Sequence, residues 1–352
     1  MKKFLSLALS VLMLLSLLAG CGGGSSTDDG AQQDGGSETA ETGGKLVVYS
    51  ALNEDNTIAM AEQFEKDTGI EVEYISLGGG DAVARVQAEM SNPQADFLVG
   101  GSVDLYGSLA EAGALLEYDS PNNDDLDARF NDPNHLWQGW YMGVLSIIIN
   151  EERFQEELAS QGLAEPATWD DLLDPRWNGQ IVMTDPGSSG SIKYFVGALM
   201  NSPAYGTAYF ERLRENGCML ESNSTATHLQ VAHGTYAVGI CMDYIVSNME
   251  EAGEPISFRL PERDTVPIYS PMGLVAGCPN ERNGRLLYDY ILSKEGQTIL
   301  TEHHLHSIRD DLGNTPDSIQ TVLDSRLPVN EQEISDTMED VMDRFDRIFF
   351  QD

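Results

Sequence analysis

Basic residues are scarce in this sequence of 352 residues. It contains 20 Lys and Arg against 57 Asp and Glu, which gives a formal net charge of −37 at neutral pH. Proteins that bind nucleic acids neutralise phosphates with clustered Lys and Arg, so we do not expect a nucleic-acid partner. An acidic surface keeps a protein dispersed. The charge of a ligand does not follow from this total, because a cleft can carry a local field opposite to that of the surface.

Cysteine is also rare. The chain has Cys21 and three further cysteines, Cys218, Cys241 and Cys278, which we call the inner cysteines. Their number is odd and no two of them are closely spaced, so the pattern does not indicate a zinc site. Two alternatives stay open for the inner cysteines: a disulfide between Cys218 and Cys241, or free buried thiols. The histidines at 303, 304 and 306, near the end of a helix, have a spacing that could bind adventitious metal, but we expect no functional site there. We therefore expect no cofactor and no functional metal.

A long apolar run lies near the start of the sequence, at residues 4–18, directly after Lys2 and Lys3. It is shorter than the roughly 20 residues that span a bilayer, and small residues follow it, so it predicts a signal peptide over residues 1–20. Leu18-Ala19-Gly20-Cys21 resembles the lipobox of bacterial lipoproteins, which implies lipidation of Cys21. The alternative is an ordinary secretory signal with an incidental cysteine.

Residues 22–44 lack the apolar side chains that a core needs. They contain eight glycines, five acidic residues, no Lys or Arg, and two alanines as their only apolar residues. A Gly-rich coil of this length spans about 25–30 Å. We predict that residues 21–44 are a lipidated cysteine and a disordered tether, and that the fold begins at Lys45.

Common catalytic motifs are missing as well. No Gly-x-Ser-x-Gly surrounds Ser189, no lysine follows that serine three residues later, and His-Glu-x-x-His does not occur. The sequence therefore predicts a protein that is not an enzyme.

The folded part begins with strands that alternate with helices. Residues 45–49, 70–75 and 96–99 read as strands, and helical patterns follow each of them. This alternation predicts a parallel α/β sheet. Residues 139–150 form a long apolar run that we interpret as a strand crossing between two lobes. Further on, a strand over 180–183 enters a Gly/Ser loop and then a helix, and residues 331–350 form an amphipathic helix.

The order of the motifs resembles a known family, the type 2 solute-binding proteins of the branch that serves ferric iron, aminoethylphosphonate and phosphorylated sugars. The landmarks cover nearly all of residues 45–311, and their order and spacing carry the resemblance. They are Leu46-Val-Val-Tyr-Ser50, Phe64-Glu-Lys-Asp-Thr-Gly69, residues 82–89, Thr168-Trp-Asp-Asp-Leu-Leu-Asp-Pro-Arg-Trp177, Asp185-Pro-Gly-Ser-Ser-Gly190, residues 234–240 and Ser293-Lys-Glu-Gly-Gln297.

This resemblance implies a two-lobed α/β fold of the periplasmic-binding-protein type, with a hinge and an interlobe cleft. Residues 45–140 and 266–309 would form the first lobe, and residues 141–265 and 310–352 the second. It also implies the extracellular component of an ABC importer. We expect a monomer that is tethered by its lipid to the extracellular face of the bacterial cytoplasmic membrane, or on the periplasmic side in a Gram-negative cell. It would deliver its ligand to permease subunits.

The loop 185–191 is the leading site candidate, because the first amides of a helix are unsatisfied and carry partial positive charge. Such a loop suits a phosphate, phosphonate or carboxylate, while helix capping by Ser188 or Ser189 is the open alternative. Other candidates lie at the ends of predicted strands. The candidate ligand-binding residues are Ser50, Asn53, Gly80, Ser102, Ser188, Ser189, Gly190, Ser191, Asn223, Ser224, Asp243, Tyr244 and Tyr269.

An organophosphate or phosphonate is the ligand class that we favour. Ferric iron is the alternative, because Asp243 and Tyr244 stand where iron-binding relatives typically supply a tyrosine pair. No His or Glu accompanies them at Ser50, Asn53 or Ser102, which weakens the iron alternative. A surface lipoprotein without a small ligand, or a hydrolase, are the alternatives of other classes.

Overall fold

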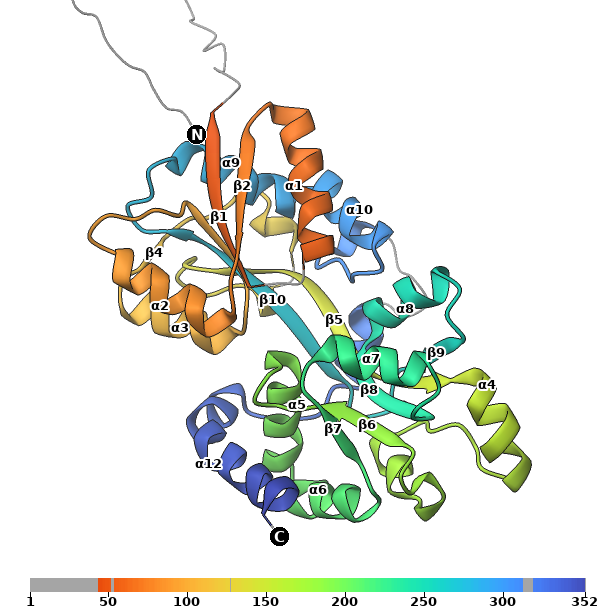
Figure 1. Ribbon diagram of the computed structural model, residues 1–352. Helices are drawn as coiled ribbons and strands as arrows, with labels where there is room; N and C mark the ends of the chain where they lie inside the picture. The colour runs from red at the N-terminus through yellow and green to blue at the C-terminus, as the bar shows by residue number, and fades with distance from the viewer. Residues whose placement is uncertain (1–43, 52–53, 127, 313–318, 352) are drawn as a thin grey trace, which may run out of the picture. The chain divides into compact units, whose positions relative to one another are not determined.

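The computed structural model describes residues 44–51, 54–126, 128–312 and 319–351. The predicted signal peptide, Cys21, the tether up to residue 43 and Asn53 lie outside these ranges. Strands alternate with helices from Lys45 onward, as the sequence predicts (Figure 1). Strand β1 pairs in parallel with β2 and with β3, so the predicted parallel arrangement is confirmed here. The elements are β1 (Lys45–Ala51), α1 (Glu54–Thr68), β2 (Glu71–Ser76), α2 (Gly79–Glu89), β3 (Phe97–Gly100) and α3 (Val103–Glu111).

The side chains of β1 point alternately to the two faces of the sheet, and helices cover both faces here. Leu46 and Val48 pack in one core with Phe64 of α1, whereas Tyr49 packs in another core with Val86 of α2. Successive side chains of a strand point to opposite faces, so a parallel strand needs apolar residues at nearly every position. Helices α9 (Glu281–Leu292) and α10 (Lys294–Glu302) complete the first of these cores.

Two long antiparallel strands, β5 (Gln138–Asn150) and β10 (Val266–Val275), connect the halves of the sheet. Strand β5 is buried throughout: Trp140 and Val144 pack in the core of the first half, and Leu145 and Ile149 in the core of the second. Residues 139–150 thus cross between two cores, as the sequence predicts. Hydrogen bonding runs unbroken along the sheet in the order β2-β1-β3-β10-β5-β8-β6-β7, because β5 and β10 belong to both halves.

The second half repeats the strand–helix pattern. Strand β6 pairs in parallel with both β7 and β8, and β5 pairs antiparallel with β8 and with β9. The elements are β6 (Ile181–Thr184), α5 (Gly190–Asn201), α6 (Gly206–Glu215), β7 (Met219–Glu221), α7 (Ser224–Ala232), β8 (Val238–Met242), α8 (Asp243–Glu251) and β9 (Ile256–Arg259).

The C-terminal helix α12 (Glu331–Phe350) has the predicted bounds and packs on α5 and α6. Its Val341 and Phe345 join the core of the second half, whereas Val322 of α11 (Ile319–Asp324) joins the core of the first. Short elements complete the described chain: β4 (Leu115–Leu116), η1 (Asn123–Asp125), η2 (Ala128–Phe130), α4 (Glu151–Arg153), η3 (Phe154–Leu158), η4 (Ala159–Gln161), η5 (Trp169–Leu173), η6 (Pro175–Trp177) and η7 (Asp310–Leu312).

The inner cysteines are free and buried, so the thiol alternative is observed and the disulfide between Cys218 and Cys241 is not. Within the described ranges, no group of three or more His, Cys, Asp or Glu side chains could hold a metal ion. None of the helices described is both long enough and apolar enough to span a bilayer.

Candidate functional site

Three helices of the second half begin at the same edge of the sheet. Strands β6, β7 and β8 are parallel neighbours, and each is followed by a helix: α5, α7 and α8. The carboxyl ends of parallel strands therefore bring the N-termini of these helices together. The hydroxyl of Ser224 donates to Ser189 Oγ at 3.4 Å, and Ser189 Oγ lies 3.2 Å from Ser191 Oγ. The predicted loop 185–191 and the predicted residue Ser224 thus form one cluster.

The electrostatics of this edge favour an anion. The first turns of α5 and α7 contain no acidic residue, although the chain has 57 of them. Unsatisfied amides and the helix dipole leave partial positive charge at both N-termini. A Cβ atom placed on Gly190 would meet open space, so nothing in the protein fills the room beside the first amide of α5.

Several predicted residues also have a structural role here. Ser189 is the N-cap of α5, where its Oγ accepts from the amide of Ile192 at 3.5 Å. Asn223 caps α7 by accepting from the amide of Ala226 at 2.8 Å. Ser188 donates to the carbonyl of Asp185 at 2.9 Å. The capping alternative is thus observed for Ser189, with Asn223 in the same role on α7.

A cavity of about 70 Å³ lies beside this cluster. It brings together three predicted site residues, Ser191, Ser224 and Tyr244, with two polar residues that the sequence analysis did not name, Thr184 and His228. Apolar side chains and one thiol form the rest of the wall: Leu145, Ile192, Ile240, Cys241, Met242 and Ile245. None of the described residues that line it carries a carboxylate.

His228 is the residue that sequence reasoning missed. Its side chain is 6% exposed, and among the described residues it has no hydrogen-bond partner. Burial lowers the pKa of His228 to about 4, so the imidazole is neutral at neutral pH. The available signal was its position four residues after Ser224, since residues at i and i+4 share one face of a helix.

Asp243 and Tyr244 begin α8 but differ in their surroundings. The carboxylate of Asp243 is 2% exposed; Oδ1 accepts from the amides of Val144 and Tyr244, and Oδ2 lies 2.6 Å from His306 Nε2. Both oxygens of Asp243 are therefore already used inside the protein. Tyr244 faces the cavity and packs edge-on against Tyr141, and burial raises the pKa of its phenol well above the usual value.

The predicted residues of the first half lie at the other end of the sheet. Ser50 is near the end of β1, Gly80 is in the first turn of α2, and Ser102 is the N-cap of α3 without a side-chain capping bond. They repeat the arrangement of strand ends and helix N-termini. Tyr269 does not join either set: it lies on β10, stacked on Trp137 and edge-on to Phe130, with ring centroids 6.4 and 5.5 Å away.

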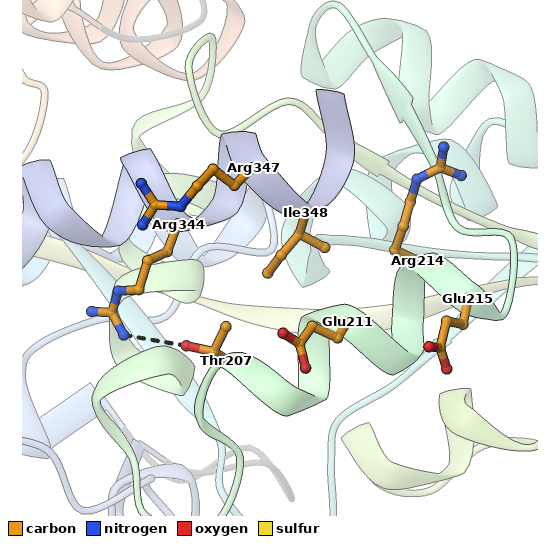
Figure 2. A pocket seen from close by; sticks show the side chains of 7 residues that line it. All are labelled: Thr207, Glu211, Arg214, Glu215, Arg344, Arg347 and Ile348. Atoms are coloured by element: carbon orange, nitrogen blue, oxygen red, sulfur yellow. Dashed lines mark hydrogen bonds between the residues drawn. The ribbon is translucent and has the colours of Figure 1, made fainter. Parts of the chain in front are cut away.

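A second hollow, of about 370 Å³, lies between α6 and α12 (Figure 2). Basic and acidic side chains share its wall, and Arg344 donates to Thr207 at 3.2 Å. Thr207, Glu211, Arg214, Glu215, Arg344, Arg347 and Ile348 line it. It contains none of the predicted site residues.

Comparison with known proteins agrees with this architecture. The family of bacterial extracellular solute-binding proteins matches residues 92–317. An uncharacterized protein of Haemophilus influenzae is 32% identical over 278 residues, which are 75% of this chain and 77% of that protein. A putative 2-aminoethylphosphonate-binding periplasmic protein of Salmonella typhimurium is 28% identical over 250 residues, which are 68% of this chain and 70% of that protein.

Among solved structures, the periplasmic binding protein AfuA from Actinobacillus pleuropneumoniae, with exogenous fructose 6-phosphate bound, is similar at a TM-score of 0.71. The two are 26% identical, and the match covers 87% of this chain and 98% of that one. The two-lobed α/β fold that the sequence predicts is confirmed. The chain belongs to the bacterial extracellular solute-binding proteins.

Proposed function

We propose that this protein captures a small anionic organophosphate or phosphonate outside the cell and delivers it to the permease of an ABC importer. The observation that carries the proposal is the meeting of two acid-free helix N-termini, α5 and α7, beside a cavity without carboxylates. Backbone amides and hydroxyls in this arrangement can hold the oxygens of a phosphoryl group. The similar proteins named for aminoethylphosphonate and solved with fructose 6-phosphate support the same class of ligand.

The second part of the proposal is hinge closure between two lobes, residues 45–140 with 266–309 and residues 141–265 with 310–352. Two separate cores support two lobes, although they meet at the Val144–Leu145 step of β5 and not at residue 140, and Val322 of α11 packs in the core of the first half. On closure, Ser50, Gly80 and Ser102 would approach the anion from the first lobe, together with Asn53, which lies outside the described residues. A reduced radius of gyration in solution scattering on addition of ligand would support closure, and an unchanged one would refute it.

Localisation is the third part. We propose that Cys21 carries a lipid, that residues 22–44 are its tether, and that the protein is held as a monomer at the outer face of the cytoplasmic membrane. The lipobox and the composition of the tether support this. Nothing in the proposal requires catalysis, and pure protein should leave fructose 6-phosphate unhydrolysed.

Ferric iron fits the site less well. An iron ligand set needs anionic oxygens. Both oxygens of Asp243 already have partners within the protein, and burial opposes ionisation of Tyr244. Tighter binding of ferric citrate than of any phosphate ester would favour the iron alternative.

The test uses Gly190→Val, because a side chain there has room in the protein but obstructs the amides at the start of α5. Calorimetry with 2-aminoethylphosphonate and fructose 6-phosphate should show binding to the native protein and at least tenfold weaker binding to the variant. Gly107→Val, in α3, is the matched control, since a Cβ also meets open space there. Equal affinity in both variants would show that the start of α5 does not bind the ligand.

A further inference from the structure

His228 lines the cavity, where its side chain can contact a bound anion. It lies on α7, one turn after Ser224, and both side chains line the cavity with Ser191 and Thr184. The imidazole is buried without a hydrogen-bond partner in the described part of the chain. Its ring nitrogens are not among the fully buried polar atoms of the described chain, so they keep some exposure and can pair with a ligand that enters the cavity.

The groups around His228 give it no opposite charge. Helix α7 packs against β5, β6, β7 and β8. Strand β6 has no titratable side chain. Burial raises the pKa values of Tyr141 on β5, Cys241 on β8 and Tyr244 on α8, so these three side chains are neutral.

The nearby carboxylates have other partners. Glu221 of β7 accepts from Gln230 of α7 at 3.0 Å, and Asp243 at the start of α8 lies 2.6 Å from His306. Asp185, in the loop before α5, accepts from the amide of Gly187 at 2.8 Å. The other charged side chain on this loop and the first turns of α5 is Lys193, and none of the described residues that line the cavity carries a carboxylate.

We infer that His228 contacts the bound anion and takes up a proton when the anion binds, so that affinity rises as the pH falls. The inference rests on the proposed function. In the free protein desolvation disfavours the imidazolium, whereas a phosphoryl oxygen beside the ring would pair with it. Two charged partners in a cavity of low dielectric then bind each other more tightly than the neutral ring and the anion do.

The size of the effect follows from linkage. The pKa of His228 is about 4 in the free protein. If the anion restores the ordinary value of about 6.5, affinity rises about tenfold between pH 8 and pH 5.5 through this group. The affinity begins to rise as the pH falls through the pKa of His228 in the ligand-bound protein. It levels off once the pH is below the pKa of His228 in the free protein.

The experiment is calorimetry with fructose 6-phosphate and 2-aminoethylphosphonate at pH 8 and pH 5.5, in two buffers of different ionisation enthalpy. The native protein should take up more protons per ligand than His228→Gln and gain about tenfold more affinity on acidification. The ligand's own phosphoryl group also titrates, with a pKa near 6, but it contributes equally to both proteins. His233→Gln, at the exposed C-cap of the same helix, should behave like the native protein.

Each outcome decides one question. Binding with the same proton number and pH dependence in native protein and His228→Gln would overturn the inference and leave the proposed function standing. Absence of binding to the native protein at both pH values would overturn the proposed function, and the inference with it. If His228→Gln fails to fold, the ring nitrogen shifts of native His228, measured by NMR with and without ligand, decide: unchanged shifts at pH 5.5 overturn the inference.

Discussion

The imidazole Nε2 of His306 lies 2.6 Å from Oδ2 of Asp243. This pair connects the segment after α10 to the first residue of α8. The second carboxylate oxygen accepts from the amide of Val144, at the step where β5 passes from one core to the other. The backbone of His306 also pairs with Met142 of β5. The pair therefore holds the crossing strand, and we attribute a structural role to Asp243.

Asp243→Ala should destabilise the protein. Removing one partner of a buried, hydrogen-bonded pair costs about 3–5 kcal/mol, and here the amide of Val144 also loses its acceptor. Denaturant unfolding should show the loss. His304→Gln is the matched control, because His304 and Glu251 form an exposed pair at 3.1 Å, whose loss costs well under about 1 kcal/mol. Equal stability of the two variants would contradict the structural role.

Ser189→Ala should weaken ligand binding about tenfold or more, since a lost hydrogen bond to a charged group costs about 1.5–3 kcal/mol. The variant also loses the cap of α5, so its melting temperature should fall slightly. Ser293→Ala separates the two effects, because Ser293 caps α10 in the same way, with Oγ accepting from Gly296 at 3.1 Å. It should lose stability and keep full affinity. Calorimetry and thermal melting measure the two quantities, and equal affinities would mean that Ser189 is a cap alone.

The inner cysteines should resist alkylation in the native state. All three are buried and free, and burial raises the pKa of Cys278 to about 11 and those of Cys218 and Cys241 further. The reactive thiolate is therefore rare at neutral pH. Mass spectrometry after iodoacetamide should find all three sites unmodified without denaturant and modified in urea. Rapid native labelling of Cys218 or Cys241 would contradict their burial.

Cys21→Ser should abolish anchoring without changing affinity. The lipobox resemblance predicts that the protein is then released or left unprocessed, while the tether contributes no binding group. Cell fractionation measures the release, and calorimetry of the purified variant measures the affinity. Membrane retention of a processed variant would refute lipidation at Cys21, and altered affinity would mean that residues 22–44 are more than a tether.

Local pattern by itself determined most of the elements. The helix α12 follows from the 3.6-residue spacing of its apolar residues, and β1 from a run that is apolar on both faces. Two strands, β4 and β7, were missed because two or three residues are too few to show a period. Strand β10 contains Pro267 and Pro271, which argue against a central strand when the sequence is read alone.

The site depends on the tertiary structure. Loop 185–191, Asn223 and Ser224 are candidates from their residue types. The contact between Ser189 and Ser224, however, exists because β6 lies between β7 and β8, an order that differs from the order in the sequence. The same pairing places His228 in a cavity and Asp243 against His306. Residue type and the spacing of apolar residues are properties of short segments, whereas the burial of a side chain and its hydrogen-bond partners arise only when distant strands align. That alignment decided which polar residues face the cavity and which stabilise the fold.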